Sequence, residues 1–242
     1  MIFKRKGSTV IVTGASSGIG QSIAKFLEKK NFNVINIDKI NKNKDIKYIF
    51  CDLSKTESIK KKIKILKKEK NIVGLVNCAG VTKTEESSKY KLSDWNLTLA
   101  VNLTAPFLFS QIVAKIMIKN NTPGSLVNIA SISSDLAMPD NPAYNSSKAG
   151  LIQLTRSLAV DLAKYNIRAN SISPGYTKTP LTIKSWNNKK LRLQRTKKTL
   201  LGKWASPDQY NEAVLFLIDK KKSSYMTGSN ITIDGGWSAK GL

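Results

Sequence analysis

The stretch TVIVTGASSGIG, residues 9–20, decides the fold class of this 242-residue chain. Residues 9–13 form a short apolar run typical of a buried strand, and the glycine-rich turn after it opens an amphipathic helical pattern. Gly14 allows a tight strand-to-helix turn, Gly18 lets the backbone approach a pyrophosphate, and Gly20 lets helix and strand pack closely. The helix N-terminus offers free N–H groups to an anion. This context predicts a dinucleotide-binding turn formed by Gly14, Ser16, Ser17, Gly18, Ile19 and Gly20.

A carboxylate follows the turn at the distance that a dinucleotide site requires. Asp38 lies 18 residues beyond Gly20, at the end of a second strand pattern, where it can accept hydrogen bonds from the two adenosine ribose hydroxyls. A negative charge at this place would repel a 2′-phosphate, which favours NAD as the cofactor. The adjacent Lys39 would partly offset that charge, and Ser17 contributes none, so NADP is the alternative.

Short apolar runs alternate with longer helical patterns along most of the chain. The runs are almost continuously Val, Ile and Leu, as expected of strands covered on both faces. The alternation predicts an α/β protein: a single-domain Rossmann fold over residues 1–242, with a doubly wound parallel sheet of about seven strands and helices on both faces. The expected strands are residues 9–13, 34–38, 47–51, 72–77, 125–130, 168–172 and 230–233.

One segment stands apart from this alternation. Residues 182–203 lose clear periodicity and carry Trp186 and several leucines among many cations. Such a segment fits a substrate-binding flap around residues 180–205, and it equally fits an ordinary pair of charged helices.

Missing residue types exclude several kinds of chemistry. The chain has no histidine and two cysteines, Cys51 and Cys78. No Ser-His-Asp or Cys-His relay is possible, and two cysteines do not complete a zinc site of about four ligands. They also give no disulfide framework. We therefore expect no metal, and proton chemistry must use tyrosine, lysine, serine or carboxylates.

The net charge of +24 raises the question of a nucleic-acid partner. The cations are 35 lysines and only 5 arginines, whereas groove and phosphate readers favour the arginine fork. The chain is also rich in isoleucine and asparagine, which share A- and T-rich codons with lysine. A biased codon usage accounts for this composition, and no nucleic-acid partner is expected.

The chain as a whole, from about Ser8 to its C-terminus, resembles the short-chain dehydrogenase/reductase family. The resemblance rests on several motifs in order rather than on one. These motifs are Thr13-Gly14-x-x-x-Gly18-x-Gly20, Asp52-Leu53, Asn77-Cys78-Ala79-Gly80, Asn102, Ser131, Tyr144-x-x-x-Lys148 and Pro174-Gly175-x-x-x-Thr179. The one small departure is Cys78, where a second asparagine is usual, and it affects no catalytic position.

Tyr144 and Lys148 stand four positions apart on a predicted helix, so their side chains project from one face. A tyrosine with a pKa of about 10 is a poor base at neutral pH, and a nearby ammonium together with an oxidised nicotinamide would lower that pKa. Taken alone, the pair also fits two ordinary helix residues, because this spacing is common. The resemblance implies that Tyr144 is the general acid/base, while Lys148 lowers its pKa and hydrogen-bonds the nicotinamide ribose.

The resemblance also implies roles for other residues. Ser131, 13 residues before Tyr144, would hydrogen-bond the substrate oxygen, and Asn102 would anchor a water that connects Lys148 to solvent. Asp52 would meet the adenine amino group, with Leu53 beside it. The further cofactor contacts implied are Asn77, Ala79 and Gly80 under the adenine ribose, Pro174, Gly175, Thr177 and Thr179 around the nicotinamide carboxamide, and Tyr144 beside Lys148.

The substrate depends on loops rather than on the fold. The segment Leu201-Gly202-Lys203-Trp204-Ala205-Ser206-Pro207 and the ending Asp234-Gly235-Gly236-Trp237 resemble family members of the gluconate 5-dehydrogenase-like branch, which act on sugars, sugar acids and polyols. We therefore expect an NAD(P)-dependent oxidoreductase that interconverts a secondary alcohol and a carbonyl on a small polar molecule. A 3-oxoacyl-[acyl-carrier-protein] reductase is the first alternative, since a basic surface suits an acidic carrier protein. A non-catalytic polyanion-binding protein is the second.

Location and assembly follow from similar arguments. Residues 10–12 are too short an apolar run for a signal peptide or a membrane span, so a cytoplasmic protein without a membrane partner is expected. The resemblance implies a homo-oligomer, a tetramer or dimer, with the helices that start near Ser93 and Ala143 buried between subunits. The apolar residues 105–109 and 151–158 suit such an interface, although a monomeric core would use them as well.

Overall fold

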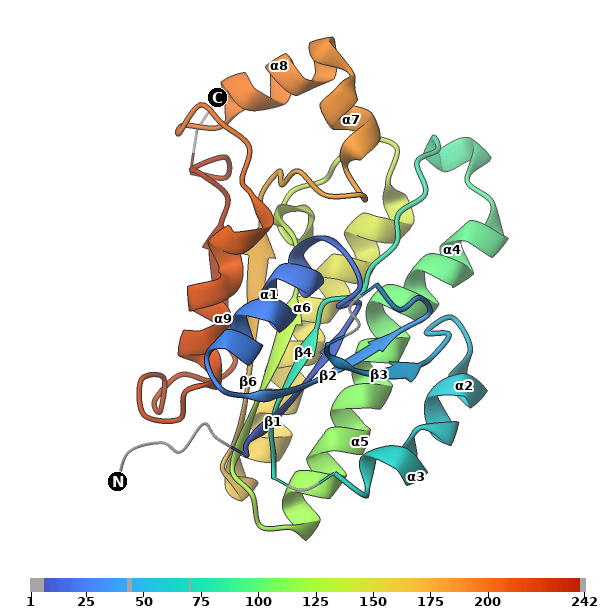
Figure 1. Ribbon diagram of the computed structural model, residues 1–242. Helices are drawn as coiled ribbons and strands as arrows, with labels where there is room; N and C mark the ends of the chain where they lie inside the picture. Colours follow the sequence, from blue (N-terminus) through green and yellow to red (C-terminus); the bar gives the residue numbers. More distant parts are fainter. Residues whose placement is uncertain (1–6, 43–44, 70, 240–242) are drawn as a thin grey trace.

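The computed structural model describes residues 7–42, 45–69 and 71–239. Seven parallel strands form one sheet in the order β3-β2-β1-β4-β5-β6-β7 (Figure 1). The predicted doubly wound parallel sheet is confirmed, because the chain runs outward from β1 to one edge and then from β4 to the other. The strands are β1 (Thr9–Thr13), β2 (Asn33–Asp38), β3 (Lys47–Phe50), β4 (Ile72–Asn77), β5 (Gly124–Ile129), β6 (Ile167–Pro174) and β7 (Asn230–Ile233).

Helices cover both faces of the sheet. One face carries α1 (Gly18–Lys29) and α9 (Asn211–Ile218), whose apolar side chains pack on the central strands. In α1, Ile23, Ala24 and Leu27 are buried while Lys25 and Lys29 are exposed, so the 3.6-residue spacing explains the packing. The other face carries α2 (Thr56–Lys61), α3 (Ile63–Leu66), α4 (Leu92–Leu99), α5 (Ala105–Lys119) and α6 (Pro142–Leu162).

Short helices complete the chain. The segment expected to form a substrate-binding flap, around residues 180–205, contains α7 (Ile183–Asn187) and α8 (Lys189–Lys198). Figure 1 shows both beyond the carboxyl ends of the strands. The remaining single turns are η1 (Ser87–Lys89), η2 (Ala100–Thr104), η3 (Ile132–Ser134), η4 (Ala163–Tyr165) and η5 (Pro207–Tyr210).

The helical segment Leu92–Lys119 is long and apolar enough to cross a membrane by length and composition alone. In this fold its apolar side chains belong to the interior. Phe109, Val113 and Met117 are buried in the cluster between the sheet and the helices of one face. The high hydropathy of this segment is therefore explained by core packing beneath the sheet.

Candidate active site

The candidate site lies where the strand order reverses, between the carboxyl ends of β1 and β4. In a doubly wound sheet this position leaves a crevice that binds ligands. Gly14 follows β1, Gly80 lies three residues beyond β4, Ser131 lies two residues beyond β5, and Pro174 ends β6. Four segments that are far apart in the sequence therefore lie at the carboxyl ends of neighbouring strands.

The turn after β1 requires glycine for steric reasons. Gly14 has φ +72°, and a Cβ added there would lie 2.6 Å from Ala79 Cα. A Cβ added at Gly20 would lie 2.4 Å from the Gly14 carbonyl oxygen. Ser17, the N-cap of α1, makes no side-chain capping bond, and the first turn of the helix has no acidic residue. The uncapped N–H groups and the cradle without side chains fit the pyrophosphate of a dinucleotide.

Asp38 is fixed beside this turn at the end of β2. Its Oδ2 accepts a hydrogen bond from Ser16 N at 3.1 Å, and its Oδ1 accepts one from Lys39 N at 2.6 Å. The Lys39 ammonium lies 3.1 Å from Asp52 Oδ2. The expectation that Lys39 partly neutralises Asp38 is therefore not met, because the lysine ammonium pairs with Asp52 instead. Hydrogen bonds from Ser54 and the neighbouring Lys39 hold the pKa of Asp52 below its usual value.

Two residues expected to contact the cofactor have inward side chains. The Asn77 amide donates to Asn128 Oδ1 at 2.8 Å and to Ser110 Oγ at 3.2 Å, inside the protein. Leu53 packs against the hydrophobic cluster. Asn77 is the last residue of a completely buried strand, which directs its amide into the interior. Beyond it, Thr13 Oγ1 accepts hydrogen bonds from the backbone N–H groups of Cys78 and Ala79, so this segment is held by its backbone.

Asn102 lies in η2, a single π-helical turn between α4 and α5. It is fully buried, and its Nδ2 donates to Val81 O at 2.9 Å and to Ser147 Oγ at 3.1 Å, while its Oδ1 accepts from Val81 N at 2.9 Å. Single π-helical turns inside α-helices occur frequently at functional sites. Periodicity alone gave no signal for this turn, because the flanking apolar pattern remains helical.

Tyr144, Ser131 and Lys148 are brought together by α6 and the segment after β5. The Ser131 side chain is a near neighbour of the Tyr144 phenol, and Lys148 Nζ lies 5.7 Å from the centre of the Tyr144 ring. Lys148 is buried and donates to the Ile129 carbonyl at 2.7 Å. A Cβ added at Gly80 would lie 3.6 Å from Asn102 Oδ1 and 3.8 Å from Lys148 Nζ. The four predicted catalytic residues therefore surround one small volume.

The loop after β6 closes over the phosphate turn. Gly175 approaches Asp234 so closely that an added Cβ would lie 2.6 Å from its Cα. Thr177 is buried, with its hydroxyl bonded to Gly175 O at 3.0 Å and to Tyr210 Oη at 2.5 Å. Thr179 reaches Gly18, where an added Cβ would lie 3.4 Å from the threonine Cβ. The loop is thus anchored next to the N-terminus of α1, although the Thr177 hydroxyl is directed into the protein.

A family model described as "Enoyl-(Acyl carrier protein) reductase" matches residues 14–238. The chain belongs to the short-chain dehydrogenase/reductase family. This enzyme is 33% identical to a 3-oxoacyl-[acyl-carrier-protein] reductase of Thermotoga maritima, over 96% of this chain and 98% of the relative. It is 31% identical to the 2-dehydro-3-deoxy-D-gluconate 5-dehydrogenase of Bacillus subtilis, over 97% of this chain and 96% of the relative.

The solved structures agree with this assignment. A structure of 4-hydroxyisoleucine dehydrogenase complexed with NADH has a TM-score of 0.92 and 35% identity, covering 97% of this chain and 100% of that one. The protein is therefore a short-chain NAD(P)-dependent oxidoreductase, as the order of motifs predicted. The interpretation as a non-catalytic polyanion-binding protein is set aside.

Burial dominates the electrostatics around the candidate catalytic residues of this dehydrogenase/reductase. It lowers the pKa of Lys148 to about 8 and raises the pKa of Cys78 to about 12, so Cys78 remains a neutral thiol. Burial also raises the pKa of Tyr144, and the hydrogen bond from Ser131 only partly opposes it. The sequence argument expected a lowered pKa for this phenol. Additional positive charge next to Tyr144 is what would reverse the direction.

The buried ammonium of Lys148 is expected to reduce stability at neutral pH. Because its pKa is about 8 in the folded enzyme and about 10.5 in an unfolded chain, the unfolded state binds more protons between these values. The destabilisation is complete below pH 8 and disappears as the pH rises to about 10.5. Lys148→Met is therefore expected to raise the free energy of unfolding at pH 7 by about 1–2 kcal/mol, after allowance for the lost bond to Ile129. Urea unfolding at pH 7 and pH 10 measures this, and a gain that does not shrink at the higher pH contradicts it.

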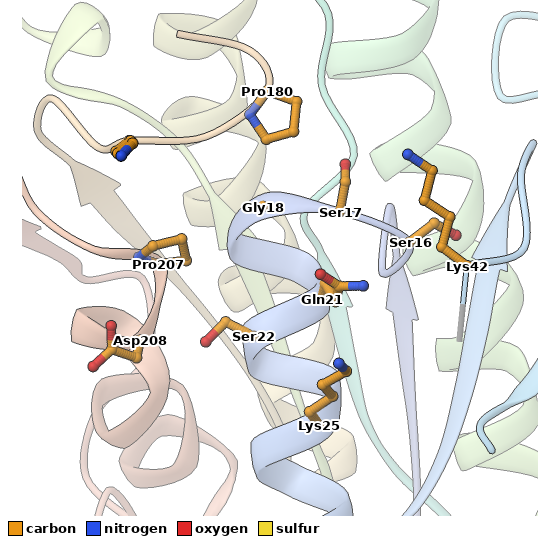
Figure 2. Close-up of a pocket in the computed structure, with 11 residues that line it drawn as sticks. Ser16, Ser17, Gly18, Gln21, Ser22, Lys25, Lys42, Pro180, Pro207 and Asp208 are labelled. Atoms are coloured by element: carbon orange, nitrogen blue, oxygen red, sulfur yellow. The ribbon is translucent and has the colours of Figure 1, made fainter. Parts of the chain in front are cut away.

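A cavity of about 450 Å³ adjoins the outer side of the phosphate turn. Figure 2 shows it between the start of α1, the loop at Pro180 and the segment at Pro207. Its lining includes Lys25, Lys42 and Lys178, none of which was singled out as a site residue from the sequence. Their positive charge favours an anion at the turn, and only the fold reveals it, because Lys42 and Lys178 are far apart in the chain.

Proposed function

We propose that the enzyme interconverts a secondary alcohol and a carbonyl on a small polar molecule, a sugar, sugar acid or polyol derivative, with Tyr144 as general acid/base. The observation that carries the proposal is the gathering of Tyr144, Ser131, Lys148 and Asn102 beside the glycine turn. A cytoplasmic location is part of the proposal.

Each residue has a role that its contacts support. The neighbouring Tyr144 and Ser131 hydroxyls hold the substrate oxygen, and the phenol takes its proton in oxidation and returns it in reduction. Lys148 places its ammonium beside the Tyr144 ring and favours the phenolate. Asn102, fixed by the Val81 backbone and Ser147, positions the route by which protons reach Lys148. When bound, the dinucleotide supplies the hydride acceptor or donor.

The substrate class is supported by the names of similar proteins. The relative from Bacillus subtilis and the 4-hydroxyisoleucine dehydrogenase are both named for small acids that carry secondary hydroxyl groups. The segments ending at Trp204 and Trp237 point to the same branch. A turnover screen of polyols, sugar acids and acyl thioesters, each with NAD and NADP, tests the proposal; activity confined to acyl thioesters contradicts it.

A 3-oxoacyl-[acyl-carrier-protein] reductase is the second candidate function. It is favoured by the 33% identical relative of that name and by the lysines of α8, which suit an acidic carrier protein. The two candidates differ in the screen, because this one requires the carrier-bound thioester.

NAD is proposed as the preferred cofactor because of Asp38. Replacing this carboxylate with asparagine removes the repulsion of a 2′-phosphate, and Lys42 beside Ser16 and Ser17 then offers a counter-charge. We expect Asp38→Asn to raise the NADP-to-NAD ratio of kcat/KM by about 10- to 100-fold, since each tenfold step corresponds to about 1.4 kcal/mol. Initial rates with both cofactors measure it, and Asp45→Asn, the same change outside the site, is the control. An unchanged ratio contradicts the role given to Asp38.

A homo-oligomer, a tetramer or dimer, also belongs to the proposal. Its support is the set of apolar side chains that α4, α5 and α6 expose: Leu92 is 71%, Phe107 42% and Val160 79% exposed. A symmetric assembly would bury such exposed apolar side chains.

A further inference from the structure

All the charged side chains of residues 176–207, the segment after β6, are positive. Residues 176–207 contain nine lysines and arginines and no aspartate or glutamate. This segment includes α7 and α8, which stand beyond the carboxyl ends of the strands (Figure 1). A cleft edged by charge of one sign concentrates ligands of the opposite sign.

Aromatic rings form the base of this segment. The Tyr176 ring centre lies 5.0 Å from that of Trp204 and 4.9 Å from that of Trp237, and Trp186 lies 5.4 Å from Trp204. Trp204 is buried, and the turn at 235–236 packs against residues 199–201. The rings therefore form a packed aromatic cluster at the base of the segment.

Arg195 of α8 lies on this surface with its hydrogen-bonding groups free. Its guanidinium carbon is 4.6 Å from the centre of the Tyr176 ring, and the residue is half-buried. Within the described part of the chain its guanidinium has neither an acidic partner nor a carbonyl acceptor. Arg192 differs, because its Nη1 donates to the Trp186 carbonyl at 3.1 Å. The cation–π contact with Tyr176 holds the Arg195 guanidinium on the ring, and its N–H groups remain available to a ligand.

Tyr176 connects this arginine with the reacting centre. It follows Pro174 by two residues, and it is close enough to Tyr144 to raise the pKa of that phenol. The Tyr176 hydroxyl also lies 3.8 Å from Sδ of Met138, on the segment that precedes α6. Tyr176 is therefore a neighbour both of the Tyr144 phenol and of the Arg195 guanidinium.

We propose that Arg195 binds a carboxylate of the substrate, so that the enzyme acts on hydroxy or oxo acids rather than on neutral polyols. The planar guanidinium matches a carboxylate with two parallel N–H···O bonds, which makes the contact specific as well as strong. The proposal rests on the proposed function and narrows its substrate class to the acids.

D-gluconate and D-glucitol test the proposal, because they differ only in a carboxylate and a hydroxymethyl group at one end. The wild-type enzyme is expected to prefer gluconate. Arg195→Gln is expected to lower kcat/KM for gluconate by about 10- to 100-fold, mostly through KM, and to change that for glucitol by less than about threefold. Arg195→Lys keeps the charge without the fork and should fall between the two. Equal losses on both substrates, or a wild-type preference for glucitol, overturn the proposal.

Lys197→Gln is the matched control, since it removes one positive charge from the same helix at an exposed position. It should change kcat/KM for gluconate by less than about twofold, which separates the specific contact from the general field. An equal loss in Lys197→Gln and Arg195→Gln would assign the effect to net charge and overturn the proposal. A loss in Arg195→Gln seen only with an acyl-carrier-protein substrate would assign the cationic surface to a protein partner and overturn it too.

A binding measurement separates this proposal from the proposed function. Three of the four tryptophans, Trp186, Trp204 and Trp237, lie in the aromatic cluster, so ligand binding should change the intrinsic fluorescence. We expect saturable responses to gluconate and to succinate in the wild type, weakened about tenfold or more in Arg195→Gln. This readout needs no turnover, so it remains valid if the proposed reaction fails. No saturable response to either acid, or equal responses in both proteins, overturns the carboxylate site.

Discussion

Tyr144→Phe is expected to lower kcat for alcohol oxidation by about 10²- to 10⁴-fold, the usual contribution of a positioned general acid/base. The change removes one oxygen atom, the phenol oxygen that neighbours Ser131. Lys148 keeps its bond to Ile129, and the glycine turn is untouched, so dinucleotide affinity should change by less than about threefold. Steady-state kinetics and a fluorescence titration with NADH measure the two effects.

Tyr165→Phe provides the control, because it makes the same chemical change at a tyrosine that is 41% exposed on the far end of the helical segment after α6. It should leave kcat unchanged. If Tyr144→Phe retains wild-type turnover, or if it loses dinucleotide affinity as strongly as turnover, Tyr144 is not the acid/base.

Gly14→Ala is expected to destabilise the protein by about 2–4 kcal/mol and to weaken dinucleotide binding. Two costs combine here: the left-handed conformation at φ +72° disfavours a Cβ, and that Cβ would lie 2.6 Å from the Ala79 backbone. Any displacement of residue 79 also moves Gly80, which borders Asn102 and Lys148. Urea unfolding and NADH titration of the variant measure both effects.

Gly202→Ala separates the two costs. Gly202 has φ +61°, but a Cβ added there meets nothing within 4 Å. Only the conformational cost remains, so the loss should be about 1–2 kcal/mol, without an effect on dinucleotide affinity. Equal losses in the two variants would show that the contact with residue 79 contributes nothing to the turn.

The sequence predicted the frame because its signals are local. The apolar runs around β1 and β4 are continuous and sharply bounded, and Thr9–Thr13 and Ile72–Asn77 agree with the predicted strands residue by residue. The expected grouping of Tyr144, Lys148, Ser131 and Asn102 depended on the order of the motifs. It could not have come from spacing alone, because the contact between Asn102 and Val81 is made only in three dimensions.

The sequence failed where side chains choose between partners. Lys39 is next to Asp38 in the sequence, and only the fold shows that its ammonium pairs with Asp52 instead. Asn77 belongs to a motif that implies a contact with the cofactor. It lies at the end of a buried strand, however, and its amide donates a hydrogen bond to Asn128. Arg195 contacts Tyr176, which lies 19 positions earlier in the sequence. The segment between them has no clear periodicity, so no sequence pattern predicted this contact.

The pH dependence of kcat tests the central claim most directly, with the best alcohol substrate and saturating NAD. If the Tyr144 phenolate is the base, kcat for oxidation rises with pH in proportion to the phenolate fraction of the enzyme–NAD–substrate complex. The reverse reaction should fall over the same pH range, and the residual rate of Tyr144→Phe should lose the dependence. An unchanged pH profile in Tyr144→Phe would contradict the account.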